Sequence, residues 1–174
     1  MTDLPTLDQQ LLAPVEQLAT TALPTDGLGL LEGLSTTRAI RRYRSEPVPA
    51  AALRAMLFAA TRAPSGSNRQ PFRFIVLTDG ATAERAKALI GGAARRLWGA
   101  KRDTDGYDRG SGASSGSPKA RMASTMQHFV DSFDSVPVLI LPCLVRYRAP
   151  NSFEGASVYP ACQNLLLAAR ALGY

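Results

Sequence analysis

The sequence predicts an α+β fold built around a layered sheet. Two apolar segments, 72–77 and 136–145, have the length and composition of largely buried strands. The segments around them show the apolar spacing of helices, and this order of helices and strands is typical of the α+β class. The length of 174 residues, with 45% hydrophobic and 20% charged residues, indicates one globular domain.

The N-terminal residues 1–27 are interpreted as an extension that leads into a domain spanning 28–174. The extension combines an amphipathic stretch with Pro24, Asp26 and Gly27. A short apolar helix is expected over 28–34. From Pro49 onward, Leu53 and the apolar positions after it follow helical spacing, with the proline near the first turn where it is favoured.

The middle of the chain predicts a strand over 72–77 and then a helix over 82–97. The next segment, 101–118, is rich in Gly, Ser and Asp and has no apolar period, so it predicts a flexible loop. Long loops in compact domains are often binding lids, but a lid and plain disorder both remain open.

The C-terminal third predicts a helix over 119–133, a buried strand over 136–145 and a helix over 158–172. The last helix is apolar around most of its circumference, which places it in a core. His128 is interpreted as a packing or surface residue, with a proton donor as the alternative. Trp98 is interpreted as a packing residue, with a role in covering substrate as the alternative. Glu154 is interpreted as a charge that precedes the last helix.

Charge and hydropathy argue against several functions. The net charge is +6, but the arginines are scattered and no zinc-finger spacing is present, so nucleic acid is not the expected partner. The segment 136–145 is too short to span a membrane, and the N-terminus lacks a secretory signal, so a cytoplasmic protein is expected. The spacing of Cys143 and Cys162 favours buried, reduced thiols over a disulfide or a metal site.

The most informative segment is the turn between the helix from Pro49 and the strand 72–77. Pro64 and Gly66 are expected to shape the backbone of this turn sharply. Its side chains offer hydroxyl and amide groups without charge: Ser65, Ser67, Asn68 and Gln70. Such groups suit a flat, polar, heterocyclic ligand. The same residues are also common in ordinary turns, so that alternative stays open.

A second informative segment is the basic stretch 37–43. Ile40 and Tyr43 are expected to anchor it in the core, while Arg38 and Arg41 face the other way toward one spot. Two guanidinium groups aimed at one place can hold a phosphate group through charge-assisted hydrogen bonds. A solvated basic turn is the alternative.

Taken together in this order, the two segments resemble those of the nitroreductase family of flavin-dependent oxidoreductases, and the resemblance runs from about Leu28 to the end. The family motif Pro-Ser-x-x-Asn-x-Gln-Pro-aromatic-x-Phe is similar to the sequence from Pro64 to Phe74. The family's basic segment is similar to 37–43, although Ala39 replaces a serine and Thr37 stands where arginine is common. The segment 163–173 resembles the family's central dimer helix.

The resemblance implies specific contacts to an FMN cofactor. Arg38 and Arg41 would hold the phosphate or the flavin edge, and Ala39 would contribute its backbone. The residues of the family motif would contribute from the turn, several of them to the flavin of the opposite subunit. The cofactor-binding residues expected from the resemblance are Arg38, Ala39, Arg41, Pro64, Ser65, Asn68 and Gln70.

The resemblance also implies a fold and an activity. The fold would be a mixed, mostly antiparallel sheet flanked by helices, in a homodimer with FMN at the subunit interface. FMN would take electrons from NAD(P)H and pass them in a ping-pong scheme to a small organic acceptor such as a nitroaromatic or a quinone, with no catalytic side chain required.

The alternative to this enzyme is a non-catalytic flavin or nucleotide-binding module. Ala39 and Thr37 depart from the family pattern, and the chain stops at Tyr174, before the C-terminal part that family members carry. The sequence is therefore expected to be C-terminally incomplete relative to the family.

Overall fold

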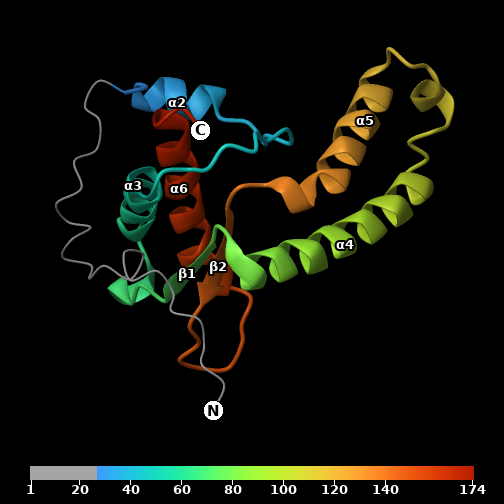
Figure 1. Cartoon of the computed structure of the whole chain (residues 1–174). Coiled ribbons are helices and arrows are strands. Elements are labelled where there is room, and N and C mark those ends of the chain that lie inside the picture. The colour runs from blue at the N-terminus through green and yellow to red at the C-terminus, as the bar shows by residue number, and fades with distance from the viewer. Residues whose placement is uncertain (1–26) are drawn as a thin grey trace. The chain divides into compact units, whose positions relative to one another are not determined.

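A computed structural model describes residues 27–174, which form an α+β structure (Figure 1). The described residues divide into two compact units. Unit 1 contains residues 27–38, Val48–Ile75 and Leu141–Tyr174, and unit 2 contains Ala39–Pro47 and Val76–Ile140. The α+β class predicted from the sequence is confirmed. Residues 1–26 of the expected N-terminal extension lie outside the described residues.

Unit 1 is built mainly from helices that pack around α6. Its elements are α2 (Leu30–Thr36), α3 (Ala50–Thr61), the 3-10 turn η2 (Gly66–Asn68), most of β1 (Phe72–Leu77) and β2 (Leu139–Leu144), the 3-10 turn η5 (Glu154–Ser157) and α6 (Tyr159–Ala171). Helix α6 packs against α3 and also contacts α2 (Figure 1). The Asn164 amide on α6 donates to the carbonyl of Ala59 on α3 at 3.2 Å.

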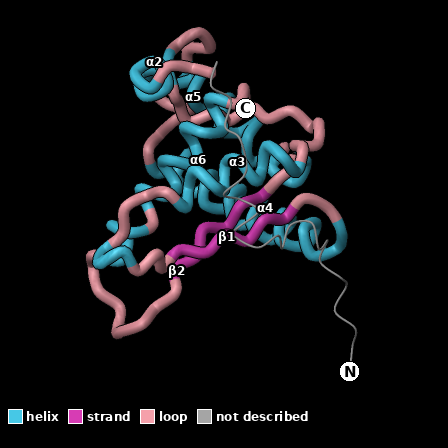
Figure 2. Tube along the Cα trace, turned by 90° about the vertical axis from the view of Figure 1, so that its left-hand side faces the viewer, coloured by secondary structure: helices cyan, strands magenta, loops and turns pink. Residues whose placement is uncertain are grey.

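The two strands form an antiparallel pair, drawn side by side in Figure 2. The amide of Val145, just after β2, donates to the carbonyl of Pro71, just before β1, at 2.7 Å. The end of one strand therefore lies beside the start of the other. The bounds predicted for β1 are confirmed. The predicted strand 136–145 is shorter, in part because Pro137 has no N–H to donate to a ladder.

A small apolar cluster of unit 1 lies where the turn after α3 meets the start of α6. Ala63, Phe72 and Ala161 are almost completely buried there, with Phe74 packed against them. The chain therefore enters and leaves the turn through buried residues, which fixes the position of the turn against the first residues of α6.

Unit 2 consists mainly of two long helices that run side by side (Figure 1). Its helical elements are α4 (Gly80–Thr104), η3 (Gly110–Ala113), α5 (Pro118–Asp131) and η4 (Phe133–Ser135). Trp98, Ala123 and Val130 form its buried cluster. The indole N–H of Trp98 donates to Gln127 Oε1 at 3.0 Å, which is consistent with the packing role expected for this residue.

The flexible loop predicted over 101–118 is wrong at its start and over 110–113. Helix α4 continues to Thr104, and η3 occupies Gly110–Ala113. Basic residues in the last turn of a helix complement its dipole, and here Lys101 pairs with Asp105 while Arg102 pairs with Asp108 at 2.8 Å. The content of Gly, Ser and Asp predicted a loop from residue 101 onward. It did not show that Lys101 and Arg102 extend the helix by pairing with Asp105 and Asp108. A lid role for this segment stays a prediction.

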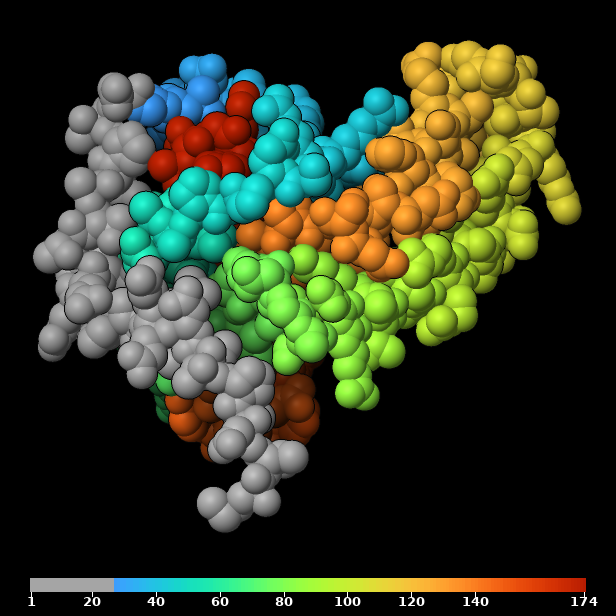
Figure 3. Space-filling view, in the orientation of Figure 1, coloured from blue at the N-terminus to red at the C-terminus, as the bar shows by residue number. Residues whose placement is uncertain are grey.

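Helix α6 is less buried within the described chain than its apolar sequence predicts. Ala161 is its one buried residue, whereas the side chain of Leu166 is 52% exposed. Figure 3 shows atoms at the C-terminal end of the chain, in red, at the surface beside α2, in blue. Helix α6 therefore packs inside unit 1 on one side, as predicted, but the expectation that it is covered around most of its circumference is wrong for the described residues.

Within the part of the chain that the structure describes, no helix is long and apolar enough to cross a membrane.

Cys143 and Cys162 are free thiols. Burial raises the pKa of the Cys162 thiol above its ordinary value.

Candidate functional site

The turn between α3 and β1 brings three of the predicted site residues together. The hydroxyl of Ser65 accepts a hydrogen bond from the amide of Gln70 at 2.8 Å. The side-chain amide of Gln70 donates to Asn68 Oδ1 at 3.4 Å, and the amide of Asn68 donates to the carbonyl of Ser65 at 2.9 Å. Pro64 precedes this network and is exposed. The turn thus holds uncharged donors and acceptors on a closed, internally bonded backbone.

The unusual backbone angles of this turn fall on residues other than glycine. Ser67, Asn68 and Gln70 have φ angles of 55°, 51° and 47°, in the left-handed region. Gly66 does not, so the expectation that Gly66 supplies the special geometry is wrong. Outside glycine and asparagine such angles cost free energy, and they are concentrated at functional sites. The Gly66 amide instead donates to Ser157 Oγ at 3.2 Å, which joins the turn to η5.

The basic segment 37–43 makes local contacts. Arg38 Nη1 donates to the carbonyls of Ser35 at 2.7 Å and Thr37 at 3.1 Å, and Arg41 Nη1 donates to the carbonyl of Ala39 at 3.2 Å. Neither guanidinium group has a carboxylate partner among residues 27–174. Arg38 belongs to unit 1 and Arg41 to unit 2, so their convergence on one phosphate stays a prediction.

The expected anchoring of this segment is wrong for the described chain. Ile40 is 57% exposed and Tyr43 is 56% exposed. The Tyr43 ring lies 6.0 Å from the ring of Phe129, and its hydroxyl donates to the carbonyl of Ile40. The segment has no regular secondary structure, so the alternation expected from the sequence does not bury either side chain.

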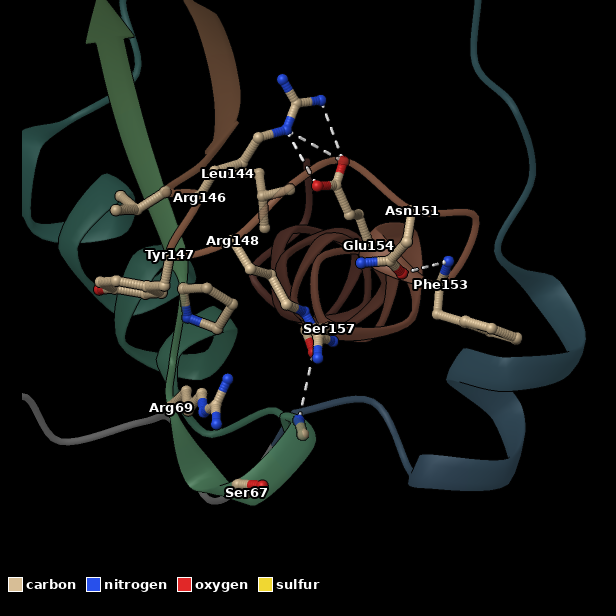
Figure 4. Close-up of a pocket in the computed structure, with 13 residues that line it drawn as sticks. Ser67, Arg69, Leu144, Arg146, Tyr147, Arg148, Asn151, Phe153, Glu154 and Ser157 are labelled. Carbon is tan, nitrogen blue, oxygen red and sulfur yellow. Dashed lines mark hydrogen bonds and ion pairs between the residues drawn. The ribbon is translucent and has the colours of Figure 1, made fainter.

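Sequence reasoning missed a cavity of about 170 Å³ in unit 1, shown in Figure 4. It lies between the turn after α3 and the segment that follows β2. The cavity is lined by Gly66, Ser67, Arg69, Pro71, Leu144, Val145, Arg146, Tyr147, Arg148, Asn151, Phe153, Glu154 and Ser157. The available signal was the sequence Arg-Tyr-Arg at 146–148, directly after the predicted strand 136–145, which was interpreted as part of a scattered positive charge.

Glu154 has a more specific role than a charge near a helix start. Its carboxylate accepts from Arg146 Nε at 2.9 Å and from Arg146 Nη2 at 3.0 Å. This two-point ion pair holds the pKa of the Glu154 carboxyl below its usual range. It also ties the segment after β2 to η5, directly before α6.

The sequence profile of the nitroreductase family matches residues 34–174, which include the basic segment, the turn and α6. The chain belongs to the nitroreductase family. The family resemblance expected from the two motifs is therefore confirmed. Among curated proteins, the chain is 58% identical over 45 residues to an NADH dehydrogenase of Thermus thermophilus, which corresponds to 26% of this chain and 22% of that protein.

Solved structures of proteins that bind FMN have the same fold. A nitroreductase of Desulfovibrio desulfuricans in complex with FMN matches with a TM-score of 0.50 and 26% identity over 83% of this chain and 64% of that chain. Iodotyrosine deiodinase bound to FMN and 3-iodo-L-tyrosine matches with a TM-score of 0.55 and 26% identity over 80% and 68%.

A nitroreductase of Bacteroides fragilis with bound FMN supports the fold alone, with 21% identity and a TM-score of 0.54 over 84% of this chain and 66% of that chain. The chain thus spans 22% of the Thermus protein and 64% of the Desulfovibrio nitroreductase.

The residues present in this nitroreductase-family chain suit the FMN that the fold implies. The guanidinium groups of Arg38 and Arg41 use their bonds on backbone carbonyls and carry no carboxylate, so their positive charge is not neutralised by a described side chain. The turn supplies neutral donors and acceptors, which match the carbonyl and nitrogen groups of a flavin ring. The arginines thus offer positive charge that suits the phosphate of FMN, and the turn offers hydroxyl and amide groups that suit its ring.

Proposed function

We propose that this protein is an FMN-dependent oxidoreductase that moves electrons from NAD(P)H to a small organic acceptor. The internally bonded turn carries this proposal, because its three left-handed residues present hydroxyl and amide groups in a fixed arrangement without any charge. The FMN bound in structurally similar proteins supports the same cofactor here.

Each predicted residue then has a distinct role toward the cofactor. Arg38 and Arg41 hold the phosphate, and the backbone of Ala39 between them contributes an amide. Pro64, Ser65, Asn68 and Gln70 face the flavin ring, several of them toward a flavin in the partner subunit. FMN held by these residues would supply the redox chemistry, a transfer of electrons from NAD(P)H to the acceptor in a ping-pong scheme.

The protein is further proposed to act as a homodimer. The apolar helix α6 has a half-exposed leucine at Leu166, and Ile75 on β1 is 50% exposed. Apolar side chains that a single chain leaves in water favour a second copy that covers them. A site divided between two subunits also requires this assembly.

The second candidate is a flavin-binding module without catalytic activity. It is favoured by Ala39, which replaces a family serine and removes one hydroxyl from the phosphate segment. This module would hold FMN but would not admit a reductant.

Anaerobic addition of NADH or NADPH to the FMN-loaded protein separates the two candidates. The oxidoreductase predicts loss of the yellow flavin absorbance on mixing, followed by its recovery when a quinone or a nitroaromatic compound is added. Persistent yellow colour with both reductants would support the binding module and overturn the enzyme. Free FMN at the same concentration is the control for reduction without the protein.

A further inference from the structure

The cavity of unit 1 carries an excess of positive charge. Three arginines and one carboxylate line it, and the carboxylate of Glu154 is already paired with Arg146. Among the contacts of residues 27–174, the side chains of Arg69 and Arg148 have no hydrogen bond or ion pair. Two guanidinium groups thus line one small cavity without a bonded carboxylate of their own, because the one carboxylate of the lining is hydrogen-bonded to Arg146.

Figure 4 shows how these two arginines are arranged. Arg69 comes from the turn after α3, and Arg148 extends from the segment after β2 toward Ser157 in the middle of the view. They approach the cavity from separate parts of the chain. An anion that enters between them gains charge-assisted hydrogen bonds from both sides and removes the repulsion of the two cations.

The remaining lining favours an organic molecule over a bare ion. The cavity of about 170 Å³ is close in size to a cavity of ~150 Å³ that holds benzene. Leu144 and Pro71 give it apolar surface, and the ring of Tyr147, which is 63% exposed, lies at its edge. A planar ring with one negative group fits both the volume and the chemistry of these residues.

The frame of the cavity is fixed by contacts independent of Arg69 and Arg148. The ion pair between Arg146 and Glu154 holds one side, and the bond from the Gly66 amide to Ser157 Oγ holds the other. Asn151 Oδ1 accepts from the amide of Phe153 at 2.9 Å, which forms a local turn in the segment before η5. A fixed frame lowers the entropy that a ligand loses when it binds.

We propose that this cavity binds a small aromatic carboxylate, with its charged group held between Arg69 and Arg148. The proposal goes beyond the flavin function and does not depend on it, because it rests only on residues of unit 1 that line the cavity. It assigns a role to the arginines that the family motifs leave unexplained.

Ligand-observed NMR titration of the purified protein with benzoate tests this assignment. Saturable binding is expected, and Arg69→Gln and Arg148→Gln are each expected to weaken it by about tenfold or more, because each removes charge-assisted hydrogen bonds. Arg85→Gln is the matched control. Arg85 is exposed on α4 in unit 2, has no bonded partner among the described residues, and should leave benzoate binding unchanged. Circular dichroism checks that each variant is folded.

Several outcomes would overturn the proposal. They are the absence of saturable benzoate binding, equal weakening by Arg85→Gln, and unchanged binding in both cavity variants. Inorganic phosphate is expected to displace benzoate by competing for the two arginines. Phosphate binding without benzoate binding would reject the organic ligand. Displacement of benzoate by FMN would assign the cavity to the flavin site and reject a separate ligand. A colourless protein that still binds benzoate would contradict only the flavin function.

Discussion

Arg41 is half-buried and makes one bond to the backbone, so its guanidinium group has donors left for a ligand. If it holds the phosphate of FMN, Arg41→Ala should weaken FMN binding by about 10- to 100-fold, since a hydrogen bond to a charged group contributes roughly 1.5–3 kcal/mol. Quenching of FMN fluorescence measures this affinity. Arg85→Ala, the control on α4, should leave it within about twofold. A similar loss in both variants would remove the phosphate role of Arg41.

The ion pair of Arg146 and Glu154 predicts a dependence of stability on pH. The pair lowers the pKa of Glu154 in the folded state, so its stabilising effect is complete above the ordinary pKa of glutamate and is lost as the pH falls through the folded value. At pH 7 the wild type should therefore be more stable to urea than Glu154→Gln. The difference should vanish in acid, and a difference that grows as the pH falls would contradict the assignment.

At the residue scale, the sequence predicted the chemistry of the turn better than its geometry. The donors and acceptors of Ser65, Asn68 and Gln70 follow from residue type. The left-handed angles do not, because Ser67 and Gln70 rarely adopt them unless the surrounding contacts impose them. Exposure of Ile40 and Tyr43 was missed for a similar reason, since burial depends on what packs over a segment.

At the element scale, the helix α5 offers a direct test of local structure. Ser117 is its N-cap, and its hydroxyl accepts from the amide of Ala120 at 3.0 Å, with Pro118 in the first turn. Ser117→Ala should destabilise the protein by about 0.5–2 kcal/mol, because one amide at the helix start loses its partner. Urea unfolding measures this change, and Ser115→Ala, two residues earlier in the turn, is the control. A loss in the control as large as in Ser117→Ala would assign the effect to the turn as a whole.

Element boundaries were predicted where the signal is local. The strand β1 follows from a mostly apolar run, interrupted at Arg73, that Pro71 precedes, and its bounds agree with the structure. The cavity could not be predicted, because it depends on which residues the antiparallel pairing of β1 and β2 places together. The bond from Val145 to Pro71 sets this register and brings the segment with Arg148 next to the turn with Arg69. The apolar pattern of the sequence predicts the two strands but does not predict how they pair.

At the scale of the whole molecule, the exposed apolar side chains predict assembly. Leu166→Lys places a charge on the uncovered face of α6 and should shift the protein from dimer to monomer in sedimentation velocity, with weaker FMN binding as a consequence. Ser124→Lys, at an exposed polar position of α5 in unit 2, adds the same charge without altering an apolar surface and serves as the control. A wild-type protein that is monomeric at micromolar concentration would contradict the dimer.

The family and the α+β class followed from two short motifs in the correct order, whereas the homodimer depends on surfaces that a single chain cannot define. The same limit applies to the flavin site, since its predicted residues lie in two units and its ring contacts are proposed to cross between subunits. Binding of FMN therefore tests the predicted binding residues, the elements that carry them and the proposed homodimer together.

The most direct measurement is the visible absorbance spectrum of the purified protein after incubation with FMN and removal of free cofactor. A yellow protein with a retained flavin band, shifted from that of free FMN by the polar turn, is expected, with a weaker band in Arg41→Ala. A colourless wild-type protein after the same treatment would contradict the flavin function.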